Sequence, residues 1–151
     1  MACEFITTDV QSVALNSPVL FTATIPCKKG YVYHEDGSGL LVLRGIVNNP
    51  NACFAQYQVS FNGNAALPEG ATVTPIAVSI VVSGEPRLSS KAIFTPAAVG
   101  DYGNLTSTAI IKVPRGCCFT LAVENVAANT TDTPAPAILI QNGNLTVSRI
   151  A

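Results

Sequence analysis

Residues 106–126, with the sequence TSTAIIKVPRGCCFTLAVENV, constrain the fold more than any other stretch of this chain. In the second half of the stretch, Phe119, Leu121 and Val123 lie on one side of the chain. They alternate with Thr120, Ala122 and Glu124, which lie on the other side. A period of two is typical of a β-strand that packs one face on a core. Between the halves, Pro114 fixes φ and Gly116 tolerates a positive φ, so the chain can reverse there. The stretch predicts two β-strands joined by a tight turn.

The rest of the chain repeats this pattern of short strands and turn residues. Residues 9–25 predict one long strand or two short ones, and further strands are expected at 31–34, 40–47, 53–61, 76–82, 88–95 and 137–150. Residues 142–144 predict a bulge or a very tight turn inside the last of these. No segment has a helical period, and strands at such spacing favour a sandwich or barrel. We expect an all-β fold of about ten antiparallel strands in two sheets, with residues 1–10 as an N-terminal arm and 11–151 as a single domain.

The chain carries little charge. Only 11% of its 151 residues are charged, with 8 Lys and Arg against 9 Asp and Glu, whereas about 25% is usual. Two interpretations remain open: a neutral surface rich in Thr, Ser and Asn, or a surface that largely faces another subunit. We favour the second, because interface cores are depleted in charge. The net charge of −1 and the lack of a basic cluster in the sequence argue against nucleic acid as a partner.

Neither a membrane segment nor an export signal is expected. No run approaches the roughly 18 apolar residues that span a bilayer. The first five residues, MACEF, lack the basic and apolar regions of a signal peptide.

The five cysteines show no metal-binding pattern; they are Cys3, Cys27, Cys53, Cys117 and Cys118. No pair has the two-residue spacing of a zinc knuckle or a redox motif. They are either small buried apolar side chains in a reduced protein, or they form disulfides within or between subunits after release from the cell. Because their number is odd, at least one thiol stays free or joins another chain. Cys3, near the terminus, is our candidate for that link.

No catalytic or cofactor site is expected. The single histidine, His34, precedes Glu35 and Asp36. These three residues could form the corner of a metal site, but without a second cluster of ligands a solvated turn is the favoured interpretation. The sequence has no nucleophile signature, phosphate loop or dinucleotide-binding glycine pattern. We therefore predict that the chain is not an enzyme and needs neither a metal nor a cofactor.

Several segments resemble the jelly roll of the tumour-necrosis-factor and complement-globular-head superfamily: residues 39–45, 57–63 and 106–126. The ending, residues 144–150, is similar to the last strand of the C-terminal heads of bacterial collagen-like spore-surface proteins. Residues 27–31 and 113–118 also resemble small proteins of gut clostridia and their phages. The resemblance implies a ten-strand, two-sheet sandwich that assembles as a homotrimer, with one sheet of each subunit facing the threefold axis. The chain lacks the Gly-x-y repeats that precede collagen-stalked heads.

Three functional hypotheses follow. The first is a structural protein, a trimeric jelly roll on the surface of a virion, where it decorates a phage capsid beside other virion proteins. The second is a spore-surface or appendage subunit that is crosslinked by its cysteines. The third is a glycan- or protein-binding module that uses loops at the ends of the sandwich. The candidate binding residues are Asn62, Glu69, Asp101, Tyr102 and Asn129.

Overall fold

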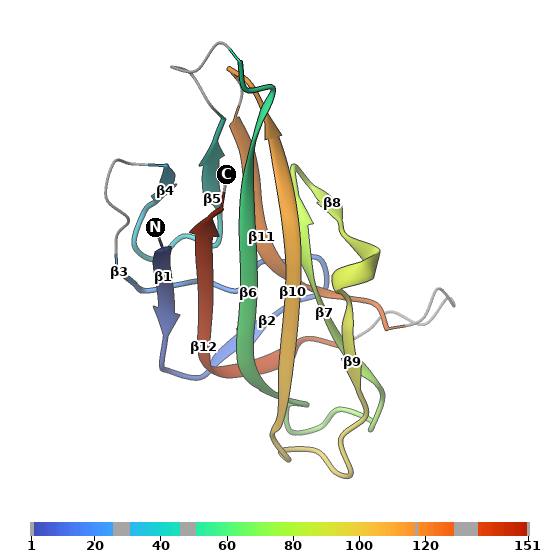
Figure 1. The fold of residues 1–151 in the computed structure, drawn as a ribbon. Helices are drawn as coiled ribbons and strands as arrows, with labels where there is room; N and C mark the ends of the chain where they lie inside the picture. Colours follow the sequence, from blue (N-terminus) through green and yellow to red (C-terminus); the bar gives the residue numbers. More distant parts are fainter. Residues whose placement is uncertain (1, 26–30, 46–50, 117, 129–135, 151) are drawn as a thin grey trace.

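Two six-stranded antiparallel sheets pack face to face in the computed structural model, which describes residues 2–25, 31–45, 51–116, 118–128 and 136–150 (Figure 1). The front sheet has the order β10-β6-β12-β1-β3, and β2 pairs with the far end of β12. The back sheet has the order β4-β5-β11-β7-β8, and β9 also pairs with β7. This arrangement confirms the all-β jelly-roll sandwich expected from the sequence. No helix among the described residues is long and apolar enough to cross a membrane.

The bounds of the strands are as follows. The front sheet contains β1 (Ala2–Thr7), β2 (Gln11–Val13), β3 (Ala23–Ile25), β6 (Phe54–Ala66), β10 (Gly103–Pro114) and β12 (Ile138–Arg149). The back sheet contains β4 (Val32–His34), β5 (Leu41–Arg44), β7 (Ile76–Val82), β8 (Glu85–Pro86), β9 (Ala92–Phe94) and β11 (Cys118–Val126). One short 3-10 helix, η2 (Leu88–Ser90), lies between β8 and β9.

The two strands predicted around Pro114 and Gly116 are β10 and β11, and Gly116 has the expected positive φ of 79°. These strands do not pair with each other, because β10 pairs with β6 and β11 pairs with β5 and β7. The tight turn instead carries the chain from the front sheet to the back sheet. Val113 and Leu121, one from each strand, are fully buried in the same core.

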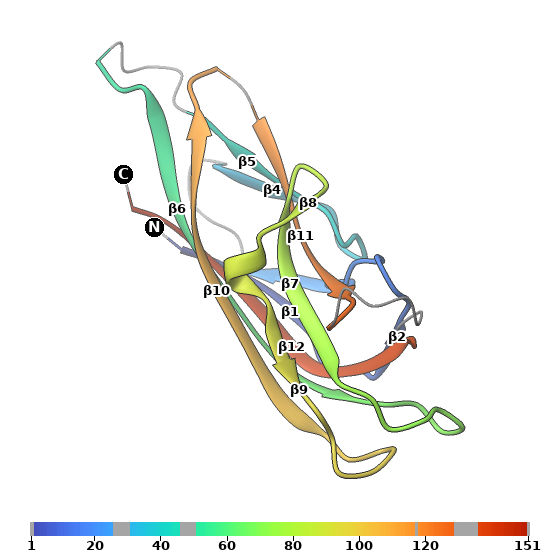
Figure 2. The same ribbon diagram turned by 90° about the vertical axis from the view of Figure 1, so that its right-hand side faces the viewer.

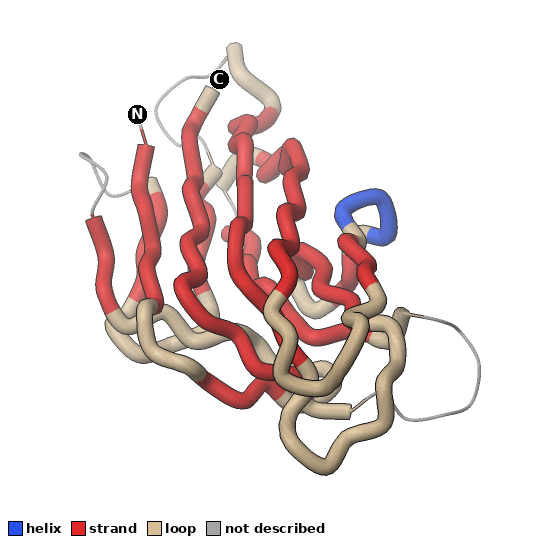
Figure 3. Tube along the Cα trace, turned by 90° about the horizontal axis from the view of Figure 1, so that it is seen from below, coloured by secondary structure: helices blue, strands red, loops and turns tan. Residues whose placement is uncertain are grey.

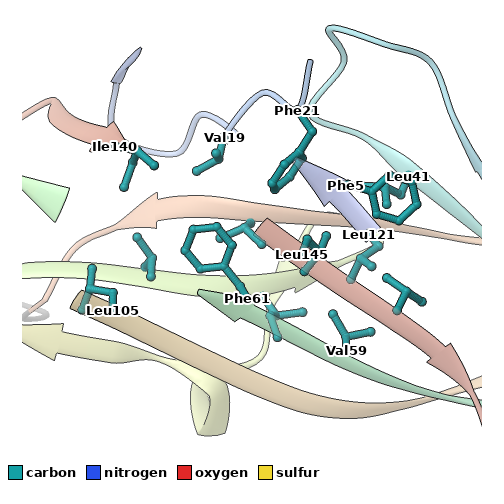
Figure 4. Packing of buried hydrophobic residues seen from close by; sticks show 14 of the residues in the cluster. Phe5, Val19, Phe21, Leu41, Val59, Phe61, Leu105, Leu121, Ile140 and Leu145 are labelled. Carbon is teal, nitrogen blue, oxygen red and sulfur yellow. The ribbon is translucent and has the colours of Figure 1, made fainter. Parts of the chain in front are cut away.

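The core fills the space between the sheets, and side chains of alternate residues meet there from both sides (Figure 4). In β6, the buried residues Tyr57, Val59 and Phe61 alternate with partly or fully exposed polar ones. The rings of Phe21 and Phe61 meet edge to face, with centroids 6.4 Å apart. Burial of such a continuous apolar layer is the main stabilising contribution to a sandwich of this kind.

Residues 2–7 form a strand inside the front sheet, which differs from the expected N-terminal arm over residues 1–10. β1 pairs with β12 on one side and with β3 on the other. Its side chains alternate between the core, where Cys3 and Phe5 are buried, and the outer surface. The alternation covers only six residues and includes a glutamate, so its period was too short to recognise in the sequence.

The segment between β2 and β3 crosses from one sheet to the other and returns. The amide of Asn16 donates to the Asn125 carbonyl at 2.7 Å, and that of Val19 donates to the Val123 carbonyl at 2.7 Å, both in β11 of the back sheet. The Thr22 amide then donates to the Ile6 carbonyl in the front sheet. Two short strands, rather than one long one, therefore occupy this region.

At the opposite edge, η2 closes the gap between the two sheets (Figure 2). The hydroxyl of Ser107 in β10 donates to the Ser90 carbonyl, while Ser79 in β7 donates to the Arg87 carbonyl at 3.1 Å. The region expected as one strand at 88–95 is thus η2 followed by the short β9. Three buried serines provide these bonds, which satisfy polar groups that would otherwise be costly to bury.

Candidate functional site

The predicted binding residues do not form one site. Asn62 was expected in a loop but lies within β6, which continues to Ala66. Glu69, Asp101 and Tyr102 are exposed in two loops at the lower end of the sandwich (Figure 3). These loops are adjacent, because the Gly100 amide donates to the Leu67 carbonyl at 3.1 Å. Asn129 lies outside the described residues.

The outer side of the front sheet is a regular surface that spans six strands, and we name it the front face. Its outward side chains alternate with the buried ones along each strand. They include Glu4, Ile6, Ala23, Ile25, Phe54, Gln56, Gln58, Ser60, Asn62, Asn64, Asn104, Thr106, Thr108, Ile110, Lys112, Asn144, Thr146 and Ser148. Only two of these carry charge, so the face combines small polar and apolar groups.

A cluster of amides and hydroxyls lies on the front face where β6 approaches its end and β10 begins. The Asn104 amide nitrogen donates to the Asn62 side-chain oxygen at 2.7 Å, and the Thr106 hydroxyl lies 3.2 Å from the same oxygen. Asn64 adds a longer contact with Asn104, at 3.4 Å. These bonds hold exposed side chains in fixed positions, which lowers the entropy lost when another surface packs on them.

An exposed isoleucine lies on each of the two border strands of the front face. At the β3 border, Ile25 is 53% exposed and lies near Ile6 and Ala23. At the β10 border, Ile110 is 52% exposed. Each border strand therefore exposes one isoleucine, and most of the other outward side chains of the front face are polar.

The cysteines have different environments. Cys3 is buried between the sheets and forms a disulfide. It is therefore not a reduced core thiol. Its burial also differs from the exposed position expected for a link between subunits. Cys53 is exposed and carries a free thiol, whereas Cys118 is exposed at the start of β11. Both lie at the upper end of the sandwich, since Cys118 is opposite Arg44 and the Cys53 carbonyl accepts from the Arg115 amide. Cys27 and Cys117 lie outside the described residues.

His34 has a structural environment rather than that of a solvated turn. Its Nε2 donates to the Ser38 carbonyl at 2.8 Å, and its Nδ1 lies 2.8 Å from the Thr24 hydroxyl, which also contacts the Asp36 carboxylate at 3.1 Å. The ring packs edge to face against Phe5, with centroids 5.0 Å apart. These bonds join β3 of the front sheet to β4 of the back sheet. Within the described ranges, no three His, Cys, Asp or Glu residues are grouped as metal ligands.

Positive charge collects at the upper end of the sandwich. Arg44 ends β5, Arg149 ends β12, and Lys112 and Arg115 lie at the end of β10 and in the turn after it. Tyr57 links two of these strand ends, because its hydroxyl donates to the Arg44 carbonyl and its Cα is opposite Arg149. Burial raises the pKa of Tyr57 above its ordinary value, although Arg149 acts in the opposite direction.

Sequence reasoning missed the front face and this charged end for the same reason. Both are assembled from strands that are distant in the chain, and their residues are ordinary Thr, Asn, Gln, Lys and Arg at exposed positions. Polar alternation in 53–61 was a usable signal for part of the front face. No local signal shows that Arg44, Arg115 and Arg149 lie at the same end of the sandwich.

The fold matches solved structures closely in shape but not in sequence. The chain is similar to the globular domain of zebrafish complement 1qA, with a TM-score of 0.65, 10% identity, and coverage of 99% of this chain and 97% of that one. It is also similar to the Eiger TNF of S. frugiperda, with a TM-score of 0.65, 13% identity, and coverage of 100% and 92%. Murine APRIL gives a TM-score of 0.57 at 10% identity, covering 95% and 96%. No family model and no curated protein sequence matches the chain. These likenesses establish a TNF- and C1q-type jelly-roll fold.

Proposed function

We propose that this protein is a non-enzymatic structural subunit that assembles as a homotrimer through its front face. The observation that carries the proposal is the nearly uncharged composition of that face in a chain whose described charges lie mostly at the ends of the sandwich. Interface cores are depleted in charged residues, whereas ordinary exposed sheet faces are not. The sequence resemblance described above implies the same threefold arrangement.

The exposed isoleucines on the two border strands of the front face support a cyclic assembly. A ring of identical subunits needs two different patches that are complementary, so that each subunit contacts its neighbour through a heterologous interface. Ile110 at the β10 border and Ile25 at the β3 border provide two such patches on opposite sides of one sheet. Packing one border of a subunit against the other border of the next would remove both isoleucines from water.

The assembly is tested by the solution mass of the chain and of a matched pair of variants. Thr108 is exposed on the front face and Thr120 is exposed on the outer side of the back sheet. We expect a trimer for the wild-type protein and for Thr120→Arg, and a monomer for Thr108→Arg, because an arginine would be buried unpaired at the interface. A wild-type monomer, or equal dissociation of both variants, would refute the role of the front face.

We further propose that the trimer lies on the outside of a particle, with a phage head as the first candidate and other virion proteins as its neighbours. The disulfide at Cys3 supports a location outside a reducing compartment, because disulfides persist in oxidising surroundings. A decoration protein also needs no catalytic site, in agreement with the expectation from the sequence. Immunogold labelling of particles released by the source cells should find regularly spaced copies; unlabelled particles would contradict this location.

The exposed Cys53 thiol favours one alternative, a spore-surface or appendage subunit in which cysteines link neighbouring copies. Such a subunit would give a ladder of oligomers on a non-reducing gel. The ladder should disappear with thiol and in a Cys53→Ser variant. A mass that does not depend on reductant would leave the non-covalent trimer as the better account.

A second alternative is a binding module that uses the lower end of the sandwich, where the loop with Glu69 is adjacent to the loop with Asp101 and Tyr102. Loops supported by a rigid sandwich are common binding sites. A glycan and protein array tests this function. Binding that is lost in Tyr102→Ala and kept in Tyr33→Ala, which removes an exposed tyrosine elsewhere, would support it.

A further inference from the structure

The front face carries two charged side chains of opposite sign, Glu4 in β1 and Lys112 in β10. The other outward side chains of the described strands in this face are neutral. The two strands lie on opposite sides of β12 and β6, which form the centre of the sheet (Figure 1). The face is therefore nearly neutral as a whole, but it has a negative side and a positive side.

Neither charge has a partner of opposite sign within the described part of its own subunit. The Glu4 carboxylate accepts from the Asn144 amide nitrogen at 3.3 Å, and the Lys112 ammonium lies 4.7 Å from the centre of the Phe54 ring. The strand register places Glu4 level with Thr108, which is three strands away and four residues before Lys112. Glu4 and Lys112 are thus about 19 Å apart, which is too far for an ion pair inside one subunit.

A subunit interface on the front face would cover both charges. Taking an unpaired charge out of water is costly, whereas a charge that meets its opposite at an interface is compensated. A second copy of the chain offers that opposite charge, because it presents the same two residues. In a closed ring, the β10 side of each subunit contacts the β1 and β3 side of the next, so every Lys112 can meet one Glu4.

We propose that Lys112 of one subunit and Glu4 of the next form an ion pair that fixes the direction in which the copies join. The ion pair rests on the proposed front-face assembly and adds the contact that orients it. Asn144 and the Phe54 ring already restrict the two charged side chains. Less conformational entropy is then lost when the pair forms.

The strand register agrees with such a contact. Glu4 and Ile25 are level with each other and with Thr108 in β10. Ile110 and Lys112 lie two and four residues further along β10, about 7 and 13 Å beyond that level. Both offsets have the same direction, so an inclination of the strands to the ring axis of roughly 20–40° brings Ile110 near the height of Ile25 and Lys112 near that of Glu4. The aliphatic part of Lys112 then crosses Ile25 before its ammonium reaches the carboxylate.

A double-mutant cycle on the assembly tests the pair, with the full chain studied by analytical ultracentrifugation over a range of concentrations. Glu4→Gln removes the charge but keeps an oxygen that can accept from Asn144, and Lys112→Gln removes the opposite charge. Residues about 19 Å apart in one subunit should have additive effects. We expect instead that each single variant raises the concentration of half-dissociation about three- to tenfold and that the double variant is no weaker than the single ones.

Charge reversal gives a second and stronger test. Glu4→Lys and Lys112→Glu each place like charges at the contact, so each should weaken the assembly by at least about tenfold. Both reversals in one chain should restore it to within about threefold of the wild type, because the pair re-forms with opposite polarity. Glu85→Lys in β8 and Lys91→Glu after η2 are matched controls with the same changes in net charge. They lie away from the front face and should leave the assembly unchanged.

The outcomes separate the ion pair from the assembly on which it rests. A wild-type monomer at every concentration would refute the front-face assembly, and the ion pair with it. A wild-type assembly in which the glutamine substitutions act additively, or in which the double reversal is no better than the single ones, would overturn the ion pair alone. Salt should weaken association of the wild-type protein and have little effect on the double glutamine variant. Circular dichroism melts show whether each variant is folded, and the glutamine cycle and the salt dependence decide the question if Glu4→Lys does not fold.

Discussion

Replacing Tyr57 by phenylalanine should destabilise the sandwich while leaving its packing unchanged. The Tyr57 ring is fully buried in β6 of the front sheet, and its hydroxyl reaches the back sheet. There it lies 2.5 Å from the Arg44 carbonyl and 3.3 Å from the Tyr31 carbonyl. The single hydroxyl hydrogen is donated to the Arg44 carbonyl, because that contact is much the shorter of the two. The substitution therefore deletes one hydrogen bond between the sheets.

The expected magnitude comes from that one bond. A hydrogen bond within a protein contributes about 1 kcal/mol net, and a carbonyl left without a donor in a partly buried site adds to the loss, so Tyr57→Phe should lower the free energy of unfolding by about 1–2 kcal/mol. For a chain of this size, each kcal/mol corresponds to about 2–4 °C in Tm. We expect Tm to fall by about 2–8 °C.

Thermal and urea unfolding followed by circular dichroism measure this loss. Tyr33→Phe is the matched control, because Tyr33 is 55% exposed on the outer side of β4 and the same atom is removed. We expect no change in its Tm. A Tyr57→Phe variant that melts with the wild-type protein, or a Tyr33→Phe variant that loses as much, would refute the role of the hydroxyl as a link between the sheets.

The wild-type protein and the Tyr57→Phe variant should respond differently to alkaline pH. Burial raises the folded-state pKa of Tyr57 above its ordinary value of 10.0. The folded protein thus retains the phenolic proton where the unfolded chain releases it. The contribution of Tyr57 to stability is complete below about pH 10 and is lost as pH rises through the folded-state pKa. The Tm difference between wild type and Tyr57→Phe should therefore shrink above pH 10, and a constant difference would contradict this reasoning.

Three further substitutions test other parts of the structure. Burial raises the pKa of Glu124, so its charged form destabilises the fold. Glu124→Gln should therefore raise Tm by on the order of 1 °C at pH 7. This gain should vanish as pH falls toward about 4.5, where the carboxyl of the wild-type protein becomes neutral. Cys3→Ser removes a buried disulfide and should cost about 2–5 kcal/mol in urea unfolding, whereas Cys53→Ser should cost almost nothing. Gly103→Ala would place a Cβ 2.5 Å from the Phe94 ring and should lower Tm, and Phe94→Leu in the same chain should recover part of the loss.

The sequence predicted the class of fold because alternation is a local signal that burial on one face imposes on every strand. It worked best where the period was long, as in the strands on either side of Pro114 and Gly116. The bulge expected at residues 142–144 is also present, as a register shift between Gln141 and Asn144 in a continuous β12. There Asn142 adopts a positive φ of 53°.

The errors occurred where tertiary pairing decides the structure of a locally ambiguous segment. Asn62 and Gly63 have the composition of a loop, but both remain in β6 because strands β10 and β12 flank them with partners for their backbone groups. Residues 2–7 form a strand because β12, from the other end of the chain, pairs with them. The location of Arg44, Arg115 and Arg149 at one end of the sandwich depends in the same way on which strand ends become neighbours.

The position of β1 between β12 and β3 also has a consequence for how the protein folds. Among the described strands, the one that is synthesised first pairs with the one that is synthesised last, from Ala2 opposite Ser148 to Thr7 opposite Gly143. The front sheet cannot be completed until the C-terminal strand has left the ribosome, because its centre requires β12. Topologies with such distant pairings fold slowly, on the order of milliseconds to seconds. Until β12 is available, one edge of β6 stays unpaired. A nascent chain with such an open strand edge is prone to aggregate before the sheet is complete.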